Sequence, residues 1–122
     1  CHFEEVAEML AEMRGTTRQT EDMIRIAEAA LAVLGTQLKK AGDPLQFVVT
    51  DETKFLDALC DQIVTATGVA HMSGYAFHGA KMEVNASNFS KFVDGKPVFA
   101  EGGKIQKGPH YFKPNLSKFL PL

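Results

Sequence analysis

Three histidines in the second half of the chain are the residues best suited to chemistry. His71 and His78 flank the segment "MSGYAF", and His110 follows in "GPHYF". If Ser73 and Gly74 form a turn, the first two rings can face each other across a hairpin, whereas on a straight strand they point to opposite faces. Neutral imidazoles are common ligands of zinc and iron. The histidines therefore predict either a site for a single zinc or iron ion or ordinary surface side chains.

Ser73 raises a second possibility, nucleophilic catalysis, because it lies between two histidines. The chain lacks the Gly-x-Ser-x-Gly motif, and no aspartate stands nearby to orient either imidazole. It also lacks Cys-x-x-Cys and His-Glu-x-x-His, the compact metal signatures. An enzyme or ligand-binding pocket that uses His71, His78, Ser73 or Tyr75 remains one alternative, and a non-enzymatic role is the other.

The two cysteines, Cys1 and Cys60, are too few for a disulfide framework. Cys60 lies in an apolar helical pattern, which predicts a buried small hydrophobic residue. Cys1 has three interpretations: the edge of a shortened chain, the first residue of a mature lipoprotein, or an N-terminal nucleophile exposed by self-cleavage.

The elements that position these residues begin with an unbroken heptad pattern over residues 3–41. Its apolar members include four residues that we expect to mediate association with a protein partner or a second copy: Ile24, Leu31, Leu34 and Leu38. Taken as one element, the pattern predicts a single long helix in a coiled coil.

Two helices are the competing interpretation of the same residues. Gly15 can end a first helix, and Thr16 with Gln19 forms a capping box for a second. In either case the helical segment ends at Gly42, with Pro44 beyond it. The sequence therefore divides into a helical segment, residues 1–42, and a second part, residues 43–122.

Residues 45–49, "LQFVV", predict a short strand, and Thr50 or Asp51 then caps a central helix that Gly68 ends. The apolar residues of this helix form one stripe, which predicts core packing. Its members are Phe55, Leu56, Leu59, Cys60, Ile63 and Val64.

Short apolar pieces separated by Gly, Asn, Asp and Pro follow from residue 69 onwards. The pair Asp94-Gly95 predicts a tight β-hairpin turn, and Pro97 restricts its strand to a sheet edge or a strand start. The sequence thus predicts an α+β fold, in which N-terminal helices and a central helix pack on a small antiparallel β module with a β-rich C-terminal half.

Within this region "VNASNFSKFVDGKPVFAEGGKIQKG", residues 84–108, resembles the PAAR-repeat proteins, the β cones at the tips of phage tails and secretion spikes. The matching positions are Gly95, Pro97 and Gly102, although "PVFA" replaces Pro-Ala-Ala-Arg and Gly103 replaces an aspartate. The resemblance implies a β tip or adaptor of a larger assembly, and a metal near the tip held by histidines and a cysteine. No cysteine lies in the predicted β-rich half of this chain, since Cys60 is the last one in the sequence.

Composition narrows the classes of protein. The chain has 122 residues, 45% hydrophobic and 23% charged, which is typical of a folded domain. A net charge of −2 disfavours nucleic acid and anionic membranes as partners, and no apolar run approaches the length of a membrane span. We expect a soluble structural or interaction module of a larger assembly, cytoplasmic or exported, with a small metal- or ligand-binding enzyme domain as the alternative.

Overall fold

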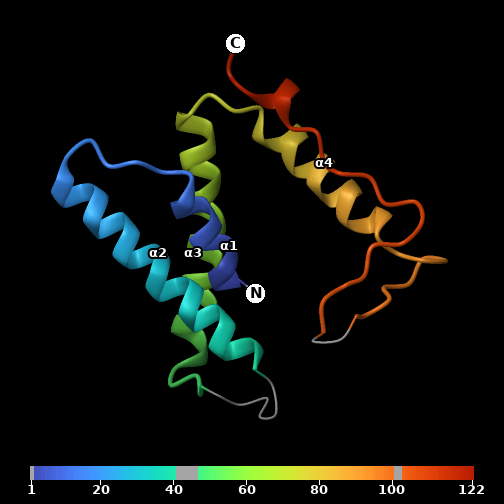
Figure 1. Ribbon diagram of the computed structural model, residues 1–122, viewed down its shortest axis with the longest axis horizontal. Coiled ribbons are helices and arrows are strands. Elements are labelled where there is room, and N and C mark those ends of the chain that lie inside the picture. The colour runs from blue at the N-terminus through green and yellow to red at the C-terminus, as the bar shows by residue number, and fades with distance from the viewer. Residues whose placement is uncertain (1, 41–46, 101–102) are drawn as a thin grey trace. The chain divides into compact units, whose positions relative to one another are not determined.

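A computed structural model describes residues 2–40, 47–100 and 103–122. These residues form four α-helices and one short 3₁₀ helix, η1 (Figure 1): α1 (His2–Ala11), α2 (Arg18–Lys39), α3 (Glu52–Met72), α4 (Phe77–Ser90) and η1 (Ser117–Phe119). The described part of the chain contains no β-strand, so the predicted α+β fold with an antiparallel β module is wrong. Two compact units divide between Val48 and Val49, whereas the sequence suggested a boundary at residue 42.

The first unit is a helical hairpin of α1 and α2, which is the two-helix alternative and not the single long helix. Thr17 lies in an extended conformation, and its Oγ1 accepts a hydrogen bond from the Thr20 backbone N–H at 3.1 Å. The Gly15 N–H donates to Glu21 Oε2 at 2.5 Å, which fixes the loop before the cap. The break thus lies where it was expected, but Thr17 and not Thr16 caps α2.

The two helices of the hairpin approach closely where α2 carries Gly35. A Cβ placed on Gly35 would lie 2.6 Å from the Glu4 Cγ of α1, so a larger residue there would displace this side chain. Next to it, Lys39 Nζ and Glu4 Oε2 form a salt bridge of 2.6 Å. The start of α1 therefore lies against the end of α2, as an antiparallel hairpin requires.

At the other end of the hairpin, Arg25 of α2 connects the two helices. Its Nη2 donates to the Leu10 carbonyl at 2.8 Å and also to the Met13 carbonyl. Carbonyls in the last turn of a helix have no partner within that helix, and a cation there also interacts favourably with the helix dipole. Glu28 Oε2 and Glu21 Oε1 hold the guanidinium from its other side at 2.6 Å and 3.1 Å. Arg25 therefore satisfies the end of α1 from the facing helix.

We predict that Arg25→Lys loosens the end of α1. The lysine keeps the charge but loses the planar guanidinium, which binds two carbonyls through Nη2 and two glutamates through its other nitrogens, at a cost of about 1 kcal/mol. Amide hydrogen exchange in α1 should then become about fivefold faster, since a fivefold change corresponds to about 1 kcal/mol. The matched control is Arg18→Lys, at an exposed arginine in the first turn of α2, which should leave the α1 rates unchanged. Equal rates in the two variants would contradict the role of Arg25.

In the second unit, α3 begins as the sequence predicts and ends later than expected. The Asp51 side chain caps the helix by accepting a hydrogen bond from the Lys54 N–H at 3.0 Å. Gly68 does not end α3, which continues to Met72; a Cβ on Gly68 would meet no atom within 4 Å. Ser73 is the C-cap of α3, and the next residue, Gly74, has a φ of +79°, the left-handed conformation that commonly follows a helix C-terminus.

The pieces predicted as strands between Gly68 and residue 90 are helical in the structure. The segment at residues 69–72 is the last turn of α3, and residues 77–90 form α4. Residues 47–49 are not a strand either, while residues 45 and 46 lie outside the described part of the chain. A short apolar run with period-two spacing is compatible with a helix as well as a strand, and here the helix forms.

The Asp94-Gly95 turn forms, but it does not extend into a β hairpin. Both residues have positive φ, +50° and +74°, as a two-residue hairpin turn requires. Val93 and Lys96 exchange backbone hydrogen bonds of 2.9 Å and 3.0 Å. One step further, the Lys91 carbonyl accepts from the Gly108 N–H, so the ladder does not continue. The predicted β hairpin is therefore wrong, although its turn is present.

The C-terminal segment lies along α4 and is held by hydrogen bonds that involve side chains. Ser87 is buried at 2% exposure, and its hydroxyl donates to the Phe112 carbonyl at 2.8 Å. The Phe112 N–H donates to Ser90 Oγ at 3.1 Å, and the Asn115 N–H donates to Glu83 Oε1 at 3.2 Å. One face of α4 therefore binds the backbone of residues 112–115, where a strand would have formed a ladder.

Near the start of α4, Phe119 of η1 packs on Gly79. A Cβ on Gly79 would lie 2.6 Å from Cε1 of the Phe119 ring, so this contact requires glycine. The Ala76 N–H donates to the Phe119 carbonyl at 2.9 Å, which ties the end of the chain to the residue before α4.

We predict opposite results for alanine at the two helical glycines of this unit. Gly68→Ala should raise the free energy of unfolding by about 0.5–1 kcal/mol, because alanine favours a helix and has open space there. Gly79→Ala should gain nothing or destabilise the unit, since the Phe119 ring has to move. Urea unfolding followed by circular dichroism compares the two variants. An equal gain at both positions would contradict the packing of Phe119 on Gly79.

Candidate functional site

The second unit leaves the apolar stripe of α3 uncovered, and we call this stripe the α3 face. Its residues are Phe55, Leu56, Leu59, Cys60, Ile63 and Val64. The prediction that this stripe is core is wrong, because Ile63 is 71% exposed, Val64 67% and Leu56 62%. Within its unit α3 meets α4 where the turn joins them, and α4 leads away from the end of α3 (Figure 1). The α3 face is therefore left to solvent by the helices of its own unit.

The α3 face is also free of charge. At 3.6 residues per turn, Lys54 and Asp61 project from the opposite side of the helix. Leu56, Leu59 and Ile63 follow the three-and-four spacing of a coiled-coil seam. An exposed apolar surface of this width is typical of a site where another protein binds.

A hollow of about 280 Å³ lies where α3 meets α4. Six residues line it: Thr67 and His71 of α3, Tyr75 of the connecting turn, and Phe77, His78 and Lys81 of α4. The structure thus brings His71 and His78 to one hollow, across a helical turn rather than across the expected β hairpin. Ser73, the candidate nucleophile, does not line the hollow; it ends α3, with its N–H donating to the Val69 carbonyl at 3.0 Å.

The structure does not bring the three histidines of the predicted metal site, His71, His78 and His110, together in one place. His110 lies in a turn of the C-terminal segment and does not line the hollow. Among the residues that the structure describes, no group of three or more His, Cys, Asp or Glu side chains could hold a metal ion. Only two of the three imidazoles therefore share one place, and a zinc or iron site stays a prediction.

Three residues of the hollow, Thr67, Phe77 and Lys81, were missed by the sequence analysis. Their signal was helical spacing: Thr67 lies four residues before His71, and Phe77 four residues before Lys81. Residues four apart are neighbours on a helix but not on a strand. The prediction of strands over residues 69–81 hides this four-residue spacing, because it has no meaning on a strand.

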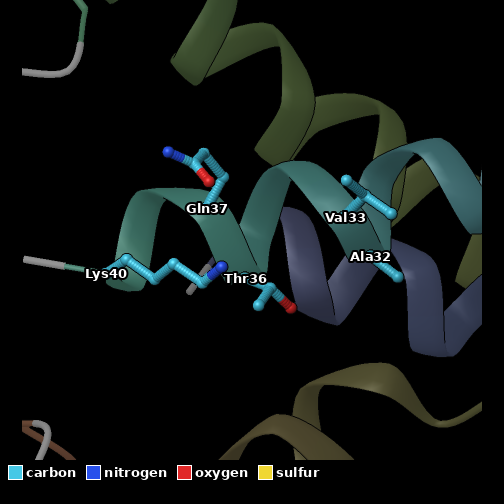
Figure 2. A pocket seen from close by; sticks show the side chains of 5 residues that line it. All are labelled: Ala32, Val33, Thr36, Gln37 and Lys40. Atoms are coloured by element: carbon cyan, nitrogen blue, oxygen red, sulfur yellow. The ribbon is translucent and has the colours of Figure 1, made fainter.

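A second hollow, of about 260 Å³, lies along α2 and offers no convergent chemistry. It is lined by Ala32, Val33, Thr36, Gln37 and Lys40. Figure 2 shows that Gln37 and Thr36 point in different directions from one stretch of α2. Polar groups that fix a ligand have to converge on it, so this hollow is a weaker candidate site.

The four residues expected to mediate association lie on α2, the helix that packs against α1. Ile24, Leu31 and Leu38 are half-buried, and Leu34 is 42% exposed. Their role in association with another chain stays a prediction.

The cysteines differ from expectation where the structure describes them. Cys60 is exposed on the α3 face, so the prediction of a buried cysteine is wrong. Cys1 and the interpretations that depend on it lie outside the described residues.

Comparison with known proteins gave no relative: no family model, no curated protein and no solved structure matches this chain. Within the described residues, no helix has both the length and the hydrophobicity needed to cross a bilayer.

Proposed function

We propose that the chain is a non-enzymatic interaction module of a larger assembly, and that the α3 face binds the same face of a second copy. The observation that carries this proposal is the exposure of Leu56, Ile63 and Val64 on a long helix. Large aliphatic side chains contribute about 1.5–3 kcal/mol each when they are removed from water. Association through this face therefore provides the burial that its own unit lacks.

The charge pattern of α3 favours a second copy as the partner. Positions beside the seam are occupied by Phe55, Cys60 and Gln62, none of which is a charged side chain at neutral pH. Two copies can therefore approach without the like-charge repulsion that excludes wrong partners from many helical interfaces. The acidic residues Asp57 and Asp61 are left at the rim or on the opposite side, where water solvates them.

A role in a larger assembly is still proposed for this chain, whereas the β tip that the PAAR-repeat resemblance implies is not. Residues 84–90 of the PAAR-like stretch lie in α4, and residues 91–108 contribute isolated β-bridges in the described part. The strands that the resemblance implies are therefore wrong. An assembly role is supported instead by the exposed α3 face.

We predict that Ile63→Glu weakens self-association at least about tenfold. The substitution places a carboxylate at the centre of the α3 face, so association would bury an unpaired charge and lose an apolar contact. Sedimentation equilibrium over a range of protein concentrations measures the dissociation constant. Because Ile63 is 71% exposed in the single chain, the substitution should leave the helix content in circular dichroism unchanged.

The matched control is Thr65→Glu, which adds the same charge to the same helix on the side opposite the α3 face. It should self-associate like the unsubstituted protein. A bifunctional maleimide provides an independent measurement, since it should cross-link two copies through Cys60 in a Cys1→Ser background. A monomer at every concentration, or equal weakening by both glutamates, would contradict the proposed interface.

A further inference from the structure

The hollow between α3 and α4 gathers groups that donate hydrogen bonds or carry positive charge. His71 and His78 contribute imidazoles, Lys81 an ammonium group and Tyr75 a phenolic hydroxyl. None of the six described residues that line the hollow is acidic, and Lys81 forms no salt bridge with any described residue. The hollow therefore has donors and positive charge without a carboxylate of its own to neutralise them.

The hydroxyl of Thr67 is not available to donate a hydrogen bond to a ligand. Its hydroxyl donates to the Ile63 carbonyl at 2.8 Å, within α3. The side chains left to bind a ligand are thus His71, His78, Lys81 and Tyr75.

The turn that carries these side chains is held by backbone hydrogen bonds. The Gly74 N–H donates to the His71 carbonyl at 3.0 Å, and the Tyr75 N–H donates to the Ala70 carbonyl at 3.1 Å. These two bonds, with Gly74 at positive φ, form a Schellman motif. The bond from the Ala76 N–H to the Phe119 carbonyl fixes the next residue. The hollow is therefore built on a defined connection between the helices.

We propose that this hollow binds a small oxyanion of the phosphate type, through His71, His78 and Lys81, with Tyr75 as a further donor. A dianion matches several donors that line one hollow without a counter-ion, because hydrogen bonds to charged acceptors are stronger than neutral ones. The volume of about 280 Å³ lies at the low end for ligand sites, which favours a small molecule. The rings of Tyr75 and Phe77 give the hollow an apolar wall for the organic part of a phosphate monoester.

The N-terminus of α4 also favours an anion in this hollow. Its first turn contains no acidic residue, and Ala76 provides no side-chain cap. The positive end of the helix dipole thus adds to the positive potential near His78, within one turn of the helix N-terminus. This contribution supplements the side chains and is smaller than theirs.

The test uses the four histidines of the whole chain as reporters. Inorganic phosphate and phenyl phosphate are titrated separately at about pH 8, where both are largely dianions, with chloride at matched ionic strength. The imidazole NMR signals of His71 and His78 should shift and saturate, while those of His2 and His110 should not. Phenyl phosphate should bind at least as tightly as inorganic phosphate if the aromatic wall is used. Equal shifts of all four histidines, or none, would overturn the proposal.

Two lysine variants separate the site from the general charge of the protein. Lys81→Gln should weaken phosphate binding at least about fivefold, as the loss of a charged hydrogen bond predicts. Lys54→Gln, which removes the same charge near the start of α3, should change binding less than about twofold. Both positions are exposed, so neither variant is expected to disturb folding. An equal effect of the two variants would show that phosphate responds to net charge alone and would refute the site.

Discussion

Burial of the apolar side chains of α3 is the main interaction that can stabilise this helix beyond its own hydrogen bonds. The second unit covers few of these side chains. Most of the stability of a helix in a protein comes from packing of its apolar face and not from helix propensity. Among the described residues, the apolar side chains that are buried are Ala7 and Ala70, both small and each still 7% exposed. The rest of the structure follows from this shortage of core: polar contacts fix the local geometry, and the exposed α3 face remains available to another molecule.

In both units, hydrogen bonds and salt bridges hold the elements together where few apolar side chains are buried. In the hairpin, Arg25 binds carbonyls at the end of α1 while Lys39 binds Glu4 at the other end. In the second unit, Ser87 fixes the C-terminal segment by a hydrogen bond from its buried hydroxyl. Such contacts contribute about 1 kcal/mol each and depend on direction, so they define where elements lie more than they stabilise them. Association through an apolar face supplies the complementary, non-directional term.

The sequence was informative where a local backbone rule decides the structure. Asp51 caps α3, the chain breaks between Gly15 and Thr17, and Asp94-Gly95 forms its turn, because each depends on a few adjacent residues. The predictions of strands were wrong because glycine and alternating apolar residues are compatible with a strand as well as a helix. The helix α4 is instead stabilised by contacts with residues distant in sequence, such as that of Ser87 with Phe112. Exposure of the α3 face could not be predicted either, since a stripe that packs inside one chain and a stripe that binds another have the same spacing.

The two proposed sites can operate on one helix without excluding each other. Ile63 lies at the centre of the α3 face, and His71 lies roughly 12 Å further along the axis at a rise of 1.5 Å per residue. The hollow takes its other residues from Tyr75 and α4, which leads away from α3 (Figure 1). A second copy on the α3 face would therefore leave Lys81 and His78 accessible to a small anion. The ligand site depends on the Gly74 turn and the association site on the middle of α3, so each is defined by its own local contacts.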